Sequence, residues 1–232
     1  MASSEPFEIC KNLYVIGGSE ISDSRDCAIY LIDLGELILI DAGAGPSASR
    51  LIKNIEKVGQ DPARLSTVIV THCHVDHSGG ARLFQKRFGA KIVMHEHDAK
   101  AVEKGDTTMT AAGWYNLSFE PTPVDVRLSG AEQTLFFGSH SLVCVHTPGH
   151  TPGSISVYVD LDGRRILFGQ DIHGPFHRDF GSNLDAWRAS MQRLLNLKAD
   201  ILCEGHFGIY QPRERVSAYI EHYLESYAED SL

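Results

Sequence analysis

Apolar residues follow two different rhythms along this chain of 232 residues. In some segments they form short continuous runs, which are typical of strands buried inside a sheet. We expect strands at residues 13–16, 27–32, 37–40, 67–70, 91–94, 135–137, 142–145, 155–159, 166–168 and 201–203. Elsewhere the apolar residues recur every three or four positions, which indicates amphipathic helices. We expect these helices at residues 47–58, 81–88, 184–195 and 213–227.

Many strands with helices at intervals favour an α+β fold in which sheets and helices are stacked in layers. No low-complexity linker divides the chain, so we predict a single domain over residues 1–232. Residues 98–132 fit the strand-and-helix rhythm poorly and contain Trp114, Tyr115 and Phe119. This segment forms either a helical excursion that packs its aromatic side chains inward or a flap inserted over a pocket.

The densest chemical signal lies in residues 71–77, which read T-H-C-H-V-D-H and directly follow a β-branched run. In an extended segment, residues two apart lie on the same side, so His72 and His74 can bind one ion. Asp76 and His77 come where the chain turns toward a helix, so they can face elsewhere. Imidazole and carboxylate groups in this spacing indicate a metal site.

Three further candidate ligands each stand just beyond an apolar run. They are His150, Asp171 and His206. If these strands end on one edge of the layered fold, the loops that follow them converge there, which is a common place for a ligand site. Cys73 lies between two candidate ligands but points to the opposite side of an extended segment, so we do not count it as a ligand.

The composition narrows the class of partner. The chain has 12 histidines and a net charge of -9 with histidine neutral, so it lacks the basic face that nucleic acid binding requires. Its five cysteines form no C-x-x-C pair, which favours a reducing compartment. No apolar run is long enough to cross a bilayer, and the first ten residues lack the apolar core of a secretory signal. We expect a cytoplasmic protein with a small-molecule substrate and no nucleic-acid or membrane partner; homo-oligomerisation is left open.

Four features together resemble the metallo-β-lactamase superfamily: H-x-H-x-D-H, the stretch T-P-G-H-T-P-G-S, an aspartate after a strand and a late G-H. The resemblance runs from about residue 13 to residue 206, and it implies a four-layer αββα sandwich with a two-metal site. The ligands that it implies are His72, His74 and His150 for the first metal, Asp76, His77 and His206 for the second, and Asp171 as the bridge. Asp41 matches an aspartate that in this superfamily usually contacts a ligand without binding the metal itself.

Within the superfamily, the complete ligand set resembles glyoxalase II, lactonases and related hydrolases. The secreted β-lactamases usually lack the complete set, and flavodiiron proteins carry glutamate at the position of His74. Two features of the nearer relatives differ here. The chain ends before the larger C-terminal region that binds glutathione in glyoxalase II, and Gly174 stands where lactonases place a tyrosine.

The resemblance predicts a metal-dependent hydrolase in which a hydroxide that bridges two metal ions cleaves an ester, thioester or lactone. Two divalent ions are expected, with zinc first and iron or manganese as alternatives. Asp76 or Asp171 would steer the proton of the nucleophile, and His173, or else His177, would donate a proton to the leaving group. Two other classes stay open: a persulfide dioxygenase with a single iron, and a phosphoester or phosphotriester hydrolase.

The remaining aromatic and histidine side chains receive structural or pocket-edge roles. His95 and His97 are expected to be structural or to lie at the edge of the pocket, and His146 is expected to be a polar residue at a strand end or else to support a ligand. The pocket wall is expected from residues 98–132 together with Phe176, Phe207 and Tyr210.

Overall fold

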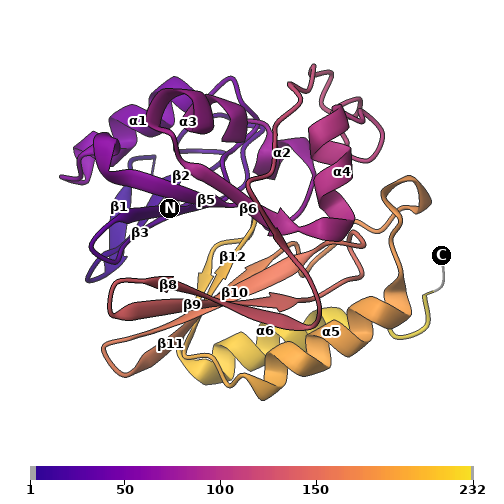
Figure 1. The fold of residues 1–232 in the computed structure, drawn as a ribbon. Coiled ribbons are helices and arrows are strands. Elements are labelled where there is room, and N and C mark those ends of the chain that lie inside the picture. The colour runs from indigo at the N-terminus through magenta and orange to yellow at the C-terminus, as the bar shows by residue number, and fades with distance from the viewer. Residues whose placement is uncertain (1–3, 231–232) are drawn as a thin grey trace.

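The computed structural model describes residues 4–230, and two packed β-sheets form its centre (Figure 1). The strands of the first sheet, in their order across it, are β1 (Phe7–Cys10), β2 (Leu13–Gly17), β3 (Ile29–Asp33), β4 (Leu37–Ile40), β5 (Leu65–Ile69), β6 (Lys91–His95) and β7 (Val126–Leu128). Those of the second sheet are β13 (Ile209–Tyr210), β12 (Ile201–Glu204), β11 (Arg164–Gln170), β10 (Ile155–Leu161), β9 (His140–His146) and β8 (Glu132–Phe137).

Helices cover the outer face of each sheet. The first sheet carries α1 (Ala48–Lys57), α2 (Val75–Ser78), α3 (Ala81–Phe88) and α4 (Glu96–Lys104). The second sheet carries α5 (Leu184–Asn196) and α6 (Arg213–Ser226). Two short 3₁₀ turns, at Pro62–Arg64 and Arg178–Phe180, complete the elements. The layers therefore run helix, sheet, sheet, helix, and the predicted αββα sandwich is confirmed (Figure 1).

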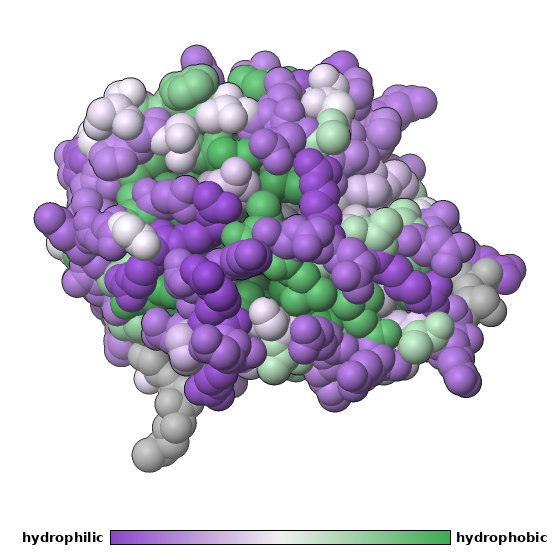
Figure 2. All heavy atoms as spheres, turned by 90° about the horizontal axis from the view of Figure 1, so that it is seen from below, coloured by the Kyte–Doolittle hydropathy of each residue, from purple (hydrophilic) through white to green (hydrophobic). Residues whose placement is uncertain are grey.

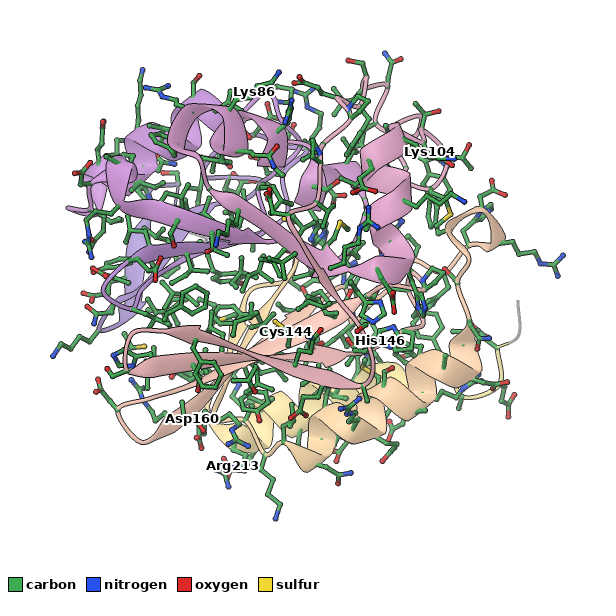
Figure 3. The ribbon with its side chains drawn as sticks, in the orientation of Figure 1. Lys86, Lys104, Cys144, His146, Asp160 and Arg213 are labelled. Carbon is green, nitrogen blue, oxygen red and sulfur yellow. The ribbon has the colours of Figure 1, made fainter. Side chains whose placement is uncertain are left out.

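Both faces of the central strands are buried, which explains their uninterrupted apolar runs. In β5, Val68 packs into the core under the outer helices, whereas its neighbour Ile69 packs into the core between the two sheets. In β3, Leu31 likewise packs under the outer helices, and Ile32 packs between the two sheets. Figure 3 shows Cys144 of β9 between the sheets, where it is buried in the same central core.

The direction of the strands brings several loops to one edge. In the first sheet, β4 and β5 run parallel, and in the second sheet β11 and β12 run parallel. Parallel strands present their carboxyl ends at the same edge, so the loops that follow them lie side by side. These two parallel pairs bring together the loops after β4 and β5 in one sheet and the loops after β11 and β12 in the other.

Most predicted elements occur, and the differences have local causes. The strand expected at residues 27–32 begins only at Ile29. The preceding residues contact the loops near the carboxyl ends of the strands: the amide of Cys27 donates to Asp76 O and that of Ala28 to Gly205 O. Strands β1, β7 and β13 were not predicted; each is short and lies at the edge of a sheet, where no long apolar run is needed.

Residues 98–132 contain most of α4, a run of turns and the short strand β7. Of the two alternatives for this segment, inward packing of the aromatic side chains describes Phe119, which is buried against the core of the first sheet. It does not describe Trp114, which is 59% exposed. The indole of Trp114 contacts the ring of Phe180, with a centroid separation of 4.7 Å.

Within residues 4–230, none of the helices has the length and apolar character needed to cross a membrane. Seen from below, the molecule shows a largely hydrophilic surface with apolar side chains visible between the charged ones (Figure 2). Helices α5 and α6 form the lowest layer of Figure 1 and therefore lie on this side. Their buried face packs on the second sheet through Trp187, Met191 and Ile220.

Candidate metal centre

Four loops carry the predicted ligands to one edge of the sandwich, and a fifth carries the supporting Asp41. Residues 71–77 follow β5, Asp171 follows β11, and His206 follows β12. His150 lies in the turn between β9 and β10. Asp41 follows β4 and lies beside the residues after β5, since its amide donates to Ile69 O. All seven predicted ligands are therefore neighbours in space, although they are spread over more than half of the sequence.

A first group contains three histidines and one oxygen of Asp171, all buried and all within 4.8 Å of one another. The closest pair is His74 Nδ1 and His150 Nε2, which are 2.9 Å apart. Asp171 Oδ2 lies 3.5 Å from His150 Nε2 and 3.9 Å from His72 Nε2. The ring of Phe180 covers His74 at a centroid distance of 4.4 Å, so an aromatic side chain shields this group.

A second group contains Asp76, His77 and His206. Asp76 Oδ2 lies 3.5 Å from His77 Nε2 and 3.3 Å from His206 Nε2. The other oxygen of Asp171 faces this group, with Oδ1 at 3.2 Å from His77 Nε2 and 3.4 Å from His206 Nε2. One carboxylate therefore presents a different oxygen to each group.

These separations fit metal coordination. A tetrahedral ion with bonds of about 2.1 Å holds its ligands about 3.4 Å apart, and the observed separations scatter around that value. Buried polar atoms normally have hydrogen-bond partners. Among the described residues, however, three of the buried atoms that face these groups have none: His72 Nε2, His77 Nε2 and Asp171 Oδ1. The residues present therefore fit two metal ions.

The local conformation differs from the extended segment assumed for residues 71–77. Thr71 to Cys73 form a bend, and His74 precedes the single turn of α2, which carries Asp76 and His77. The alternation argument was therefore wrong, although His72 and His74 do face the same space. The exclusion of Cys73 is consistent with its contacts, because its thiol donates to Met109 O, away from the ligands.

Asp41 supports the second group from outside. Its Oδ2 lies 2.8 Å from His77 Nδ1, and its Oδ1 accepts a hydrogen bond from the amide of Thr71. This contact assigns the proton of His77 to Nδ1 and leaves Nε2 free to face Asp171. Asp41 adopts a left-handed backbone with φ of 64°, an uncommon conformation that aspartate tolerates better than most residues.

A second supporting carboxylate, Asp98 in α4, was missed by the sequence analysis. It is fully buried and accepts hydrogen bonds from the amide of Cys73, the hydroxyl of Thr151 and the amide of Gly153. Asp98 therefore ties the loop of His72 and His74 to the loop of His150. Its sequence position in the first turn of a polar helix gave no sign of this role.

Two glycines permit close approach to the ligands. A Cβ atom on Gly205 would lie 2.4 Å from Asp171 Oδ1, so only glycine leaves room for this carboxylate oxygen. Gly149, with φ of 145°, lets the loop of His150 lie against the backbone of Trp187 in α5. These positions explain why glycine directly precedes both His150 and His206.

The two groups differ in protonation. Burial lowers the pKa of His74 to about 4 and that of His150 to about 3, so both rings are neutral at pH 7. Burial opposes the charge on His206 as well, but the nearby carboxylates of Asp171 and Asp76 together outweigh it and raise the pKa of His206 to about 10. The first group is therefore ready to coordinate, whereas the second carries a proton.

His173 lies beside the second group and has a buried partner that the sequence analysis missed. Its Nδ1 is 2.9 Å from Glu204 Oε1. The other oxygen of the fully buried Glu204 accepts hydrogen bonds from the amides of His206 and Phe207. Glu204 therefore orients His173 and the loop of His206 together. A glutamate directly before the G-H pair was the only available signal in the sequence.

His177, the alternative proton donor, lies farther out. It is exposed, and its Nδ1 accepts a hydrogen bond from the amide of Asp179 within the same short turn. Its ring contacts Trp114 and Phe180 rather than the ligand groups.

His95, His97 and His146 also gather, around the ends of β6 and β9. Figure 3 shows His146 at the end of β9, on the side of α4. The rings of His95 and His146 are stacked 3.8 Å apart at an interplanar angle of 9°. A metal ion lies close to the plane of each ring that binds it, and two nearly parallel planes share no such position. These rings are therefore packed against each other and not arranged around one ion.

A cavity of about 370 Å³ lies over the ligand groups. Its wall includes Trp114 and Tyr115 from residues 98–132, together with Phe180 and Phe207. Two aromatic residues that were predicted to form the wall of the pocket lie elsewhere. Phe176 packs against Trp187 and Tyr227, and Tyr210 packs against Tyr219 in α6.

Comparison with known proteins agrees with this arrangement. The sequence model of the metallo-beta-lactamase superfamily matches residues 23–206. The probable metallo-hydrolase MJ0888 of Methanocaldococcus jannaschii is 32% identical over 55% of this chain and 60% of its own length. The human acyl-coenzyme A thioesterase MBLAC2 is 27% identical over 69% of this chain and 57% of its own length. The chain thus spans about three fifths of the length of these relatives.

A solved structure matches the fold along nearly the whole chain. The class B3 di-zinc metallo-beta-lactamase LRA-12, from an Alaskan soil metagenome, superposes with a TM-score of 0.78 and is 27% identical. The match covers 96% of this chain and 90% of that one.

Proposed function

The chain belongs to the metallo-β-lactamase superfamily, and from this premise we propose that it is a hydrolase that uses two metal ions to cleave an ester, thioester or lactone. One observation carries the proposal: the two oxygens of Asp171 face two separate ligand groups under one cavity. A carboxylate in this position can bridge two ions. Seven donor side chains at coordination distances support two ions better than one.

Zinc is the metal that we propose, because each group offers four closely spaced donors, with Asp171 counted in both, and all of them are imidazole or carboxylate. His72, His74 and His150 would hold the first ion, Asp76, His77 and His206 the second, and Asp171 both. Ions bound there would lower the pKa of a water molecule to about 7 and polarise a carbonyl oxygen. Asp41 would keep the ring of His77 in the orientation that coordination needs.

The residues around the ligands would handle the protons. Asp76 and Asp171 are buried carboxylates beside the place where water would be activated, and either would accept a hydrogen bond from that water and so steer its proton. His173 lines the same cavity and would donate a proton to the leaving group. Glu204 is a positioning residue in this scheme, since its contact with Nδ1 directs the other ring nitrogen of His173 away from it.

The relatives support hydrolysis of a carbonyl compound. One is named as an acyl-coenzyme A thioesterase and another as a probable metallo-hydrolase, and the matched structure is a di-zinc β-lactamase. These names concern those proteins alone.

The decisive experiment is a hydrolysis panel on protein with counted metal ions. Aryl esters, thioesters, lactones and phosphotriesters would be assayed after loading with zinc, iron or manganese, and metal content would be measured per chain. We expect two ions and turnover of at least one carbonyl substrate. A single iron with oxygen uptake on a persulfide would overturn the proposal, and turnover of phosphotriesters alone would replace it with phosphoester chemistry.

The role of His173 has its own test, which depends on the leaving group. A 4-nitrophenolate leaves without needing a proton, whereas an alkoxide needs one. His173→Gln should therefore lower kcat for an alkyl ester by about a hundredfold and for the matched 4-nitrophenyl ester far less. Glu204→Gln should also lower kcat more for the alkyl ester than for the 4-nitrophenyl ester, but by a smaller factor. Equal losses on both esters would show that His173 is not the proton donor.

A further inference from the structure

A second and larger cavity adjoins the one over the ligands. It encloses about 610 Å³ and lies between the turn after β2 and the start of β13. Its apolar lining comes from Phe7, Val15, Ile21, Tyr30 and Ile209. A cavity of this size and character is typical of a site that receives an apolar part of a small molecule.

The two cavities meet at Ser19 and His206, which line both of them. His206 belongs to the second ligand group, and its side chain is 25% exposed, whereas the other ligand side chains are almost completely buried. A molecule whose reacting carbonyl lies over the ligands can therefore extend past His206 into the larger cavity.

The turn that roofs the larger cavity is held in place by buried polar contacts. The carboxylate of Asp26 accepts hydrogen bonds from the hydroxyl of Ser22 and the amide of Ala44. The hydroxyl of Ser22 in turn accepts one from the amide of Gly18. These contacts fix residues 18–26 to the loop after β4, so the wall of the cavity is held in place by the fold.

Its charge limits what can enter. Among the described residues that line the two cavities, none is lysine or arginine. The larger cavity instead contains Glu20, which is exposed, and Asp26, which is buried. Beyond His206, a phosphate or carboxylate group would find no lysine or arginine there and would face like charge from Glu20.

We propose that the larger cavity binds an uncharged apolar group of the substrate, an acyl chain or aryl group attached to the reacting carbonyl. The substrate class is then an ester, thioester or lactone with such a group, and any charged carrier must leave the cavity on another side. This inference rests on the proposed hydrolase function and adds its specificity: the apolar group binds beyond His206, against Ile21 and Ile209.

The test compares substrates that share one leaving group and differ in acyl length from acetyl to decanoyl. Burial of each methylene should raise kcat/KM by about fourfold until the cavity is full. Ile209→Trp fills the cavity, and Ser19→Trp narrows the passage between the cavities. Each should lower the decanoyl-to-acetyl ratio of kcat/KM by about tenfold or more. Thr134→Trp, on the exposed edge strand β8, is the matched control and should leave the ratio unchanged.

A binding measurement separates failure of this inference from failure of the hydrolase proposal. The neutral fluorescent probe N-phenyl-1-naphthylamine should bind the metal-loaded protein, and Ile209→Trp should weaken its binding while Thr134→Trp should not. Probe binding without any hydrolysis would support the cavity and contradict the hydrolase. Hydrolysis with no dependence on acyl length, or with equal losses for acetyl and decanoyl in both tryptophan variants, would overturn the cavity assignment.

A charged substrate tests the electrostatic part. An octanoyl ester with a carboxylate at the far end of the chain should react at least about tenfold more slowly than octanoyl itself. Glu20→Lys should recover much of that loss, and Glu20→Gln should recover less. If the charged and neutral chains react equally well in the unmodified protein, the acyl chain does not enter this cavity.

Discussion

The two ligand groups of the metal centre are built from similar side chains but differ in their surroundings. The first, around His72, His74 and His150, is buried, and burial keeps the pKa values of its rings low. The second, around Asp76, His77 and His206, borders both cavities, and the pKa of its exposed member is raised to about 10. Burial thus keeps the first group neutral and able to bind an ion, whereas the second group must release a proton when its ion binds.

The difference suggests a division of work between the groups. A buried, neutral set of imidazoles can bind an ion without releasing protons, so we expect the first group to fill first. The second group lies where a substrate can reach it, and its occupancy depends on pH. The comparison also bears on the one-metal alternative, because a protein with only its first group filled would be mononuclear.

The largest effect is expected when the shared ligand is removed. Asp171→Ala takes one oxygen from each group, so metal analysis should find both ions lost or weakly held. Activity should fall by more than the roughly 10- to 100-fold that loss of a supporting residue costs. The matched control is Asp160→Ala, in the outer part of β10, which should retain two ions (Figure 3). Full activity with two ions in Asp171→Ala would show that the groups are independent.

The next effect separates the groups. His206→Ala should leave one tightly bound ion per chain, whereas His150→Ala should weaken the ion that fills first. In both variants, kcat/KM for the best substrate should fall by at least about a hundredfold. Stepwise metal titration followed by elemental analysis measures the difference. If the two variants lose the same ion, the assignment of ligands to two groups is wrong.

A smaller effect is expected from outside the ligand set. Asp41→Asn keeps the shape and tolerates the left-handed backbone but weakens the contact with His77 Nδ1. Affinity for the second ion should fall by about 10- to 100-fold, with little change in the first. Asp33→Asn, at the end of the neighbouring strand β3, serves as the control. An equal loss of affinity for both ions in Asp41→Asn would mean that Asp41 supports the whole edge of the sheet.

The smallest effect concerns protons. At pH 7 the ring of His206 is protonated in the metal-free protein, because its pKa is raised to about 10, so the second ion must displace that proton. Its affinity should rise by up to about tenfold per pH unit between pH 7 and pH 9. Binding of the first ion should release almost no protons, because His74 and His150 lose their protons near pH 4 and pH 3. Calorimetry in buffers of different ionisation enthalpy counts the protons, and equal release at both steps would contradict the comparison.

The central part of the fold could be predicted from the sequence. The segments 37–40 and 81–88 agree with β4 and α3 at both ends, because strands buried on both faces and an amphipathic helix leave unambiguous patterns. Edge strands such as β1 were missed, since a half-exposed strand of four residues has no distinctive pattern. Helix α4 was missed because its sequence, EHDAKAVEK, is mostly polar.

The ligand set was also accessible, because histidine and aspartate were dense and each stood directly after an apolar run. The supporting residues were not. Asp98 acts across a distance of 53 positions when it accepts from Thr151, and Glu204 across 31 positions when it contacts His173. Such contacts depend on how the two sheets pack, and spacing along the chain carries no information about that packing.

The ligands also come from both sheets, and this has a mechanical consequence. His74 follows a strand of the first sheet, and His150, 76 positions later, belongs to a turn of the second. An ion held by both is a cross-link between the two halves of the sandwich. An ion at a thousand times its dissociation constant would stabilise the folded chain by about 4 kcal/mol. Metal supply would then set how long the two halves stay joined when the protein is heated or pulled.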